Sequence, residues 1–168
     1  MGANGTRVSA IVTTFNYAQF IGDALDSVLG QSRPPDEIIV VDDGSTDATR
    51  DIVASYASHG VRYVWQENQG AGAARNRGIA ESSGELIAFL DADDLWMSDK
   101  LERQLAYLDI HPQAVLVSGQ MLWWHVRKET RHVERFGVRC GRDPRSELTV
   151  RNIVGNPSMP LIRRSALE

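Results

Sequence analysis

The sequence has little cysteine and no long hydrophobic run. Cys140 is the single cysteine among 168 residues, which excludes an internal disulfide framework and favours a reducing compartment such as the cytoplasm. No uninterrupted apolar segment approaches the roughly 20 residues that a membrane-spanning helix needs. The first ten residues also lack the basic and apolar regions of a signal peptide. We therefore expect a cytoplasmic protein.

Several motifs for metals, phosphates and nucleic acids are also missing. The four histidines show no metal-ligand spacing, and nothing matches a Walker phosphate loop. The segment NQGAGAARNRG (68–78) is not a dinucleotide fingerprint, because Arg75 stands where the third glycine should be. Since the net charge is −4 and no basic stripe contains interleaved aromatics, we expect no nucleic-acid partner.

The charge is distributed unevenly along the chain. Residues 1–122 carry a net charge of −9, whereas residues 123–168 carry +5. Such an imbalance favours two solvated faces of opposite sign. The alternative is a basic region that contacts anionic lipid or a phosphorylated ligand, which would place the protein peripherally at the inner face of the membrane.

Strand and helix patterns alternate along the first two thirds of the chain, and the length suits one domain. Segments rich in β-forming or apolar residues predict strands at 8–15, 37–43, 61–66, 85–92 and 114–124. Apolar residues at helical spacing predict four intervening helices, with Ser45 or Thr46 as the cap of the second and Ser98 as the cap of the fourth. This alternation predicts an α/β fold with a mostly parallel sheet. Residues 125–168 are less regular, with turn residues at Gly137, Gly141 and Pro144.

The segment GELIAFLDADDLW (84–96) delivers three carboxylates to the end of an apolar strand. Asp91, Asp93 and Asp94 fall within four positions, so either they point apart into water or a cation lies among them. Oxygen ligands without histidine suit Mg²⁺ or Mn²⁺, which commonly complete their coordination with waters and substrate phosphates. A solvated loop is the alternative.

Two other segments place polar groups at the same expected edge of the sheet. In VVDDGSTD, an Asp-Gly turn before a capped helix explains Gly44 but not two acids after four apolar residues. The glycines of residues 68–78 precede a helix, whose free N–H groups favour anions. Arg75 or Arg77 could face a phosphate, or each could be a solvated helix residue.

The order of these blocks closely resembles family 2 glycosyltransferases with the GT-A fold. The resemblance runs from about residue 7 to about 118, and it continues more weakly through GNPSMPLIRRSALE (155–168). It implies a Rossmann-like three-layer sandwich. It also implies an inverting, metal-assisted enzyme that transfers a sugar from a nucleotide diphosphate sugar, most often a UDP-sugar, to a hydroxyl of a saccharide or lipid-linked acceptor.

The resemblance also implies roles for particular residues. Thr13 and Phe15 would line the base pocket, and Asp43 would accept a hydrogen bond from the base. Arg75 and Asn76 would lie near the donor, and Asp91 would meet the ribose. Asp93 and Asp94 would bind Mg²⁺ or Mn²⁺.

One departure from the family pattern concerns the general base. In the family this base is usually an Asp beyond the segment that resembles MPLIRRSALE, and the sequence stops at Glu168. We therefore expect the chain to be the N-terminal, donor-binding part of a longer enzyme, with its base beyond Glu168. The alternatives are a module that binds nucleotide sugars without turnover and a receiver-like phosphoacceptor domain, which would want a lysine that the 114–124 segment lacks.

Overall fold

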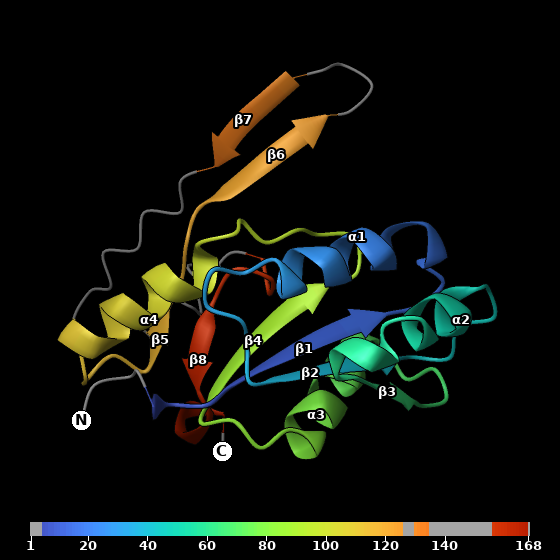
Figure 1. Cartoon of the computed structure of the whole chain (residues 1–168), viewed down its shortest axis with the longest axis horizontal. Helices are drawn as coiled ribbons and strands as arrows, with labels where there is room; N and C mark the ends of the chain where they lie inside the picture. The colour runs from blue at the N-terminus through green and yellow to red at the C-terminus, as the bar shows by residue number, and fades with distance from the viewer. Residues whose placement is uncertain (1–4, 126–129, 135–155, 168) are drawn as a thin grey trace.

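The computed structural model describes residues 5–125, 130–134 and 156–167. Its centre is a six-stranded sheet with the strand order β3-β2-β1-β4-β8-β5 (Figure 1). The strands are β1 (Val8–Thr14), β2 (Glu37–Asp42), β3 (Val61–Trp65), β4 (Leu86–Asp91), β5 (Leu116–Val117) and β8 (Leu161–Arg163). The first four are parallel, and β8 runs antiparallel to both of its neighbours. The predicted α/β fold with a mostly parallel sheet is confirmed.

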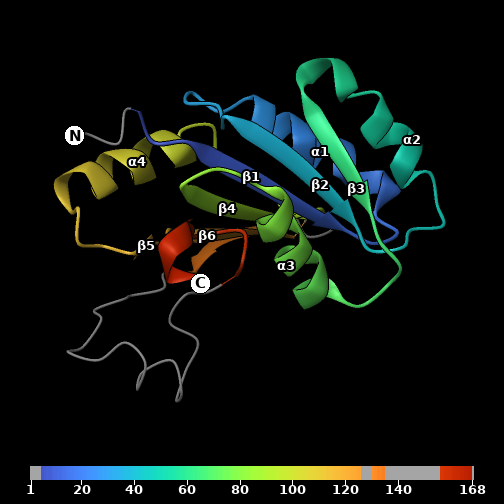
Figure 2. The ribbon, with the colours of Figure 1, turned by 90° about the horizontal axis from the view of Figure 1, so that it is seen from below.

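Helices cover both faces of the sheet (Figure 2). They are α1 (Ala18–Leu29), α2 (Thr49–Ala54), α3 (Ala71–Glu81) and α4 (Lys100–Ile110), with short 3-10 turns η2 (Ala57–His59) and η4 (Arg164–Ala166). Alternate residues of β1 divide the core between the faces: Val8, Ala10 and Val12 pack with α1, α2 and α4. Ile11 packs on the opposite face with Ala74 of α3. The expected three-layer arrangement is therefore present.

The prediction of a single strand over residues 114–124 is wrong. Strand β5 has only two residues at the edge of the main sheet, while β6 (Met121–His125) pairs with β7 (Thr130–Glu134) in a separate two-stranded sheet. Figure 1 shows this hairpin projecting beyond the main sheet. Gly119 and Gln120 interrupt the apolar run between the two strands, and a glycine weakens a strand at its interior. Cys140 and the predicted turn residues Gly137, Gly141 and Pro144 lie outside the described residues.

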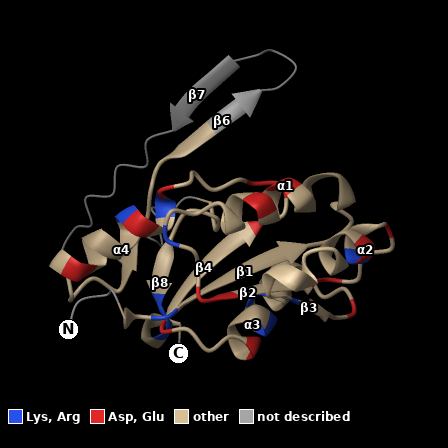
Figure 3. Cartoon of the chain, viewed as in Figure 1, with Lys and Arg blue, Asp and Glu red and all other residues tan. Residues whose placement is uncertain are grey.

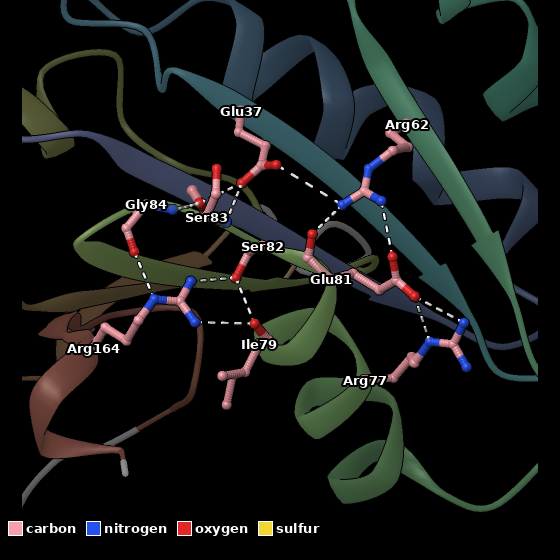
Figure 4. Close-up of polar contacts among 10 residues, drawn as sticks. Glu37, Arg62, Arg77, Ile79, Glu81, Ser82, Ser83, Gly84 and Arg164 are labelled. Carbon is pink, nitrogen blue, oxygen red and sulfur yellow. Dashed lines mark hydrogen bonds and ion pairs between the residues drawn. The ribbon is translucent and has the colours of Figure 1, made fainter.

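Polar contacts fasten the end of the sheet from which β1 and β4 begin (Figure 4). The guanidinium of Arg164 donates to the carbonyl oxygens of Gly84 (2.8 Å) and Ile79 (3.1 Å) and to Ser82 Oγ (2.7 Å). Arg164, which follows β8 in the chain, thus caps the C-terminal end of α3. Nearby, Arg62 pairs with Glu81 at 2.9 Å, which ties β3 to α3.

A close approach between backbone and side chain fixes α3 against β1. A Cβ atom added to Gly78 would lie 2.3 Å from Ile11 Cγ2, so any larger residue would force the helix or the Ile11 side chain to move. Because α3 also carries Arg75, the small residue sets how near that arginine comes to the ends of the strands.

The described part of the chain shows neither a basic stripe nor a membrane-spanning helix. Lysine and arginine residues are spread over several described elements and do not gather in one stripe (Figure 3). Among the described residues, no helix has the length and apolar character to cross a membrane.

Candidate functional site

The carboxyl ends of β1, β2 and β4 and the start of α3 enclose a cleft of about 500 Å³. Ligands bind at this edge of a parallel sheet because loops and helix N-termini converge there. Six of the residues predicted from sequence line the cleft, namely Thr13, Phe15, Asp43, Arg75, Asp91 and Asp93. The lining also includes Gly70, one of the glycines predicted to lead into an anion-favouring helix start. Sequence patterns did not indicate the other lining residues, which are Thr14, Tyr17, Asn68, Ala71, Ala74 and Ala92. Asn76, exposed on α3, and Asp94 are not part of the lining.

A cation lies among the strand-end acids, and it is Arg75. Its Nη2 donates to Asp91 Oδ1 at 2.7 Å, and Thr13 Oγ1 donates to the same oxygen at 3.0 Å. Both side chains of the ion pair are about a quarter exposed. The pair joins α3 to β4 within the cleft lining, and it neutralises the carboxylate that the strand presents there.

The other two acids point elsewhere. Asp93 is exposed, whereas Asp94 Oδ2 accepts hydrogen bonds from Ser158 Oγ (2.6 Å) and Asn156 Nδ2 (2.8 Å). Burial raises the pKa of Asp94, and the negative charges of Asp93 and Asp91 raise it further, while the two hydrogen bonds act in the opposite direction. The three carboxylates therefore have separate surroundings. Asp91 is in an ion pair, Asp93 is exposed, and Asp94 accepts hydrogen bonds from two neutral donors.

Asp43 is buried, with 3% of its surface exposed, and its carboxylate organises the loop before α3. Oδ1 accepts from Gln66 Nε2 (2.6 Å) and from the backbone N–H of Gln69 (3.0 Å). Oδ2 accepts from the N–H of Gly70 at 2.7 Å. The next residue, Gly44, has a φ of 89° and lies against Asn68, so the turn after β2 requires a glycine.

Aromatic side chains stand at the mouth of the cleft. Phe15 and Tyr17 are 44% and 37% exposed, and the ring of Tyr17 packs against Phe20 with 5.9 Å between centroids. Between them, Asn16 adopts a left-handed φ of 56°. Its Oδ1 accepts from the N–H of Thr46 at 2.8 Å, and its own N–H donates to Ser45 Oγ at 2.8 Å.

The prediction that Ser45 or Thr46 caps the second helix is therefore wrong. Both residues hold the turn at Asn16, whereas Asp47 Oδ1 accepts from the first N–H of α2, at Thr49. Ser98 does not cap α4 either, since the residue before that helix is Asp99, and the N–H of Leu101 in the first turn donates to Gln31 Oε1 at 3.0 Å. Ser45 and Thr46 instead hold Asn16, which lies between the lining residues Phe15 and Tyr17.

Two buried side-chain polar atoms within the described part of the chain lack a hydrogen-bond partner, and both belong to the cleft lining. They are Thr14 Oγ1 and Arg75 Nε. Buried polar groups in folded proteins are almost always paired, and exceptions gather where function requires them. Their presence in one cleft is what a ligand-binding site would show.

The strand-end acids offer the type of ligand atom that a divalent cation prefers, but they do not form a complete binding site by themselves. Carboxylate oxygens suit Mg²⁺ or Mn²⁺. Within the described ranges, however, no three histidine, cysteine, aspartate or glutamate residues are arranged to hold a metal ion. Asp93 and Asp94 could supply at most part of a coordination shell, with waters and ligand phosphates supplying the remainder.

Curated relatives with similar sequences are bacterial glycosyltransferases. An uncharacterized glycosyltransferase of Nostoc sp. is 44% identical over 100 residues, which are 58% of this chain and 31% of that protein. TuaG of Bacillus subtilis, named for teichuronic acid biosynthesis, is 45% identical over 104 residues, or 60% of this chain and 41% of TuaG. The matched region is less than half the length of either relative.

Solved structures and a family model lead to the same group. Residues 1–349 of S. aureus TarS in complex with UDP have a TM-score of 0.61 and 32% identity, covering 66% of this chain and 34% of that one. The mannosyltransferase PcManGT from Pyrobaculum calidifontis, in complex with GDP-Man and Mn²⁺, has a TM-score of 0.70 and 27% identity, covering 96% and 46%. The model of glycosyl transferase family 2 matches residues 9–168. The chain belongs to glycosyl transferase family 2 and has the expected GT-A fold.

Proposed function

We propose that this chain binds a nucleotide diphosphate sugar in the cleft, as the donor half of an inverting, metal-assisted glycosyltransferase. The observation that carries the proposal is the cleft itself. The cleft has a volume of about 500 Å³. It is lined by acids, by an arginine whose Nε has no hydrogen-bond partner, by a helix N-terminus and by two exposed aromatic rings. Similar solved structures are complexes with UDP, UDP-GlcNAc or GDP-Man, which supports a donor of this class.

The nucleobase would lie near Thr13, Phe15 and Asp43. The Asp43 carboxylate accepts three hydrogen bonds from the chain, two of them on Oδ1. Because a carboxylate offers about four lone-pair positions, one remains on Oδ2 for a ring N–H of the base. Uracil and guanine carry such a donor, whereas adenine and cytosine do not. Asp43 would therefore favour UDP-sugars or GDP-sugars.

The diphosphate would lie between Arg75 and the start of α3. The first N–H groups of a helix have no intrahelical acceptor, and the helix dipole favours an anion there. Gly70 and Ala71 place this end of α3 in the cleft lining. Asn76, assigned to the donor from sequence, is exposed on the same helix outside the lining, so its contact would be peripheral.

Asp91 would accept a hydrogen bond from a ribose hydroxyl, and Asp93 and Asp94 would hold Mg²⁺ or Mn²⁺. A bound divalent cation supplies positive charge that offsets the charge on a departing nucleoside diphosphate. An inverting transfer also needs a base near the acceptor hydroxyl. Asp43 and Asp91 are already engaged in hydrogen bonds and Asp93 would hold the metal, so we assign no base among the residues that line the cleft.

Calorimetric titration tests the proposal directly. UDP, GDP, ADP and CDP are each titrated into the chain with Mn²⁺ and again with excess chelator. We expect UDP or GDP to bind most tightly and only with Mn²⁺, and Asp93→Asn to weaken that binding. Asp51→Asn, an exposed change on α2, should leave it intact. Absence of binding by all four nucleotides would refute donor binding, and equal affinity in chelator would refute the metal.

A further inference from the structure

The segment Asn156–Met159 lies directly against the end of β4, although more than 60 residues separate them in sequence. Ser158 Oγ accepts a hydrogen bond from the backbone N–H of Asp91 at 2.9 Å and donates one to Asp94 Oδ2 at 2.6 Å. A single hydroxyl thus contacts two of the three acids. It fixes the backbone of one and the side chain of the other.

The segment is itself held rigidly. Asn156 Oδ1 accepts from the N–H of Ser158 at 2.7 Å, and Asn156 Nδ2 donates to Asp94. The indole N–H of Trp96 donates to the carbonyl of Ser158 at 2.9 Å. Ser158 and Trp96 are each 6% exposed, so these bonds form where water cannot easily replace them.

Both donors to Asp94 meet the same oxygen. Oδ2 accepts from Ser158 and Asn156, and no donor from the described part of the chain is recorded for Oδ1. Two donors on one oxygen fix the rotation of the carboxyl group and leave the other oxygen for a further ligand. Neither donor is charged, so this arrangement does not neutralise Asp94, in contrast to the ion pair at Asp91.

We propose that Ser158, with Asn156, is a positioning residue that orients Asp94 toward the divalent cation of the donor site. This inference rests on the proposed function. Groups that orient a metal ligand affect metal affinity strongly, because a ligand in the wrong rotamer has to be reoriented each time the metal binds. In Ser158→Ala, Asp94 Oδ2 loses one of its two donors and the Asp91 N–H loses its acceptor.

The test compares Ser158→Ala with Ser158→Thr, which keeps the hydroxyl, and with Ser165→Ala, the same change at an exposed position of η4. UDP and GDP are titrated calorimetrically over a range of Mn²⁺ concentrations. We expect Ser158→Ala to weaken the apparent Mn²⁺ affinity about 10-fold or more, the range known for such orienting groups. Ser158→Thr should recover most of the Mn²⁺ affinity, and Ser165→Ala should match the wild type.

A second readout needs neither metal nor nucleotide. Because the Asp91 N–H donates to Ser158 Oγ, its amide hydrogen should exchange at least about 10-fold faster in Ser158→Ala, with neighbouring β4 amides unchanged. If that variant does not fold, Asn156→Ala, which removes the other donor to Asp94 and leaves Ser158 in place, carries the titration. Wild-type Mn²⁺ affinity in a folded variant would overturn the positioning role. Failure of the wild type to bind nucleotide with Mn²⁺ would instead overturn the proposed function, and the positioning role with it.

Discussion

Arg75 Nη2 on α3 lies 2.7 Å from Asp91 Oδ1 at the end of β4. Asp91 follows five buried residues of its strand, and two further acids lie within three positions of it. The arginine neutralises Asp91, whereas Asp93 is exposed and Asp94 accepts hydrogen bonds from Ser158 and Asn156. It also connects two of the elements that line the cleft.

Replacing Arg75 by alanine should lower the free energy of unfolding by about 1–3 kcal/mol. The pair is partly buried, so its loss should cost more than a typical exposed ion pair and less than a fully buried one. Arg77→Ala is a matched control on the same helix, since its partner Glu81 lies one turn away and Arg77 is 48% exposed. That change should cost at most about 0.5 kcal/mol. Equal losses in urea denaturation would show that the Arg75 pair contributes no more than a surface contact.

Much of the fold follows from local patterns in the sequence. Buried parallel strands are continuous apolar runs, and those at 8–15, 37–43, 61–66 and 85–92 end within one or two residues of the predicted bounds. The failure at 114–124 has a physical cause. An apolar run shows that a segment is buried or paired, but it does not show which sheet it joins, and here β6 pairs with β7.

The edge of the sheet at which the cleft lies could be predicted from sequence, but the contacts within the cleft could not. Strand-end acids predict an edge of the sheet, because parallel strands share that edge. The two hydrogen-bond partners of Asp94 are Asn156 and Ser158. No local sequence pattern links residues that are more than 60 positions apart in the chain. Likewise, the pairing of Arg75 with Asp91 depends on how closely α3 packs on β1, which the contact of Gly78 with Ile11 determines.

The close contact between Gly78 and Ile11 predicts that adding one methyl group at position 78 lowers the stability of the fold. In Gly78→Ala the new methyl group would meet Ile11 Cγ2 at 2.3 Å, so α3 or the side chain has to move. We expect a loss of about 1–3 kcal/mol, typical of overpacking. Gly72→Ala in the same helix meets nothing within 4 Å and should be neutral or stabilising by up to about 1 kcal/mol. Thermal unfolding of the two variants measures the difference, and similar midpoints would contradict close packing at Gly78.

Asp43→Asn should loosen the loop before α3. An asparagine presents one N–H₂ group in place of a carboxylate oxygen, so it faces at least one of the three donors from Gln66, Gln69 and Gly70 with another donor. The unpaired buried groups should cost about 1–3 kcal/mol. Amide hydrogen exchange at Gln69 and Gly70 should quicken, whereas Asp51→Asn on α2 should leave those amides unchanged. Unaltered exchange in Asp43→Asn would show that the loop is held by other contacts.

Lys100 predicts a pH dependence of stability. Its Nζ lies 4.3 Å above the ring of Trp96 and donates to Gln104 Oε1 at 2.9 Å, and burial lowers the pKa of Lys100 to about 7. Between pH 7 and the ordinary lysine pKa of about 10.4, the unfolded chain holds a proton that the folded chain has released. Stability therefore rises with pH through this window, by up to about 1.4 kcal/mol per pH unit. Below pH 7 both states are protonated, and the cost of burying the charge is present in full.

Comparison with Lys100→Met isolates this contribution, because other groups titrate alike in both proteins. At pH 6–7 the methionine variant should be as stable as the wild type or more so, since it buries no ammonium group. As the pH rises toward 10, the free energy of unfolding of the wild type should increase steadily relative to that of the variant. Arg103→Met, an exposed change on the same helix, should keep the wild-type rise. Urea denaturation at one-unit steps from pH 6 to 10 measures the difference, and parallel curves for Lys100→Met and wild type would mean that Lys100 keeps an ordinary pKa in the folded protein.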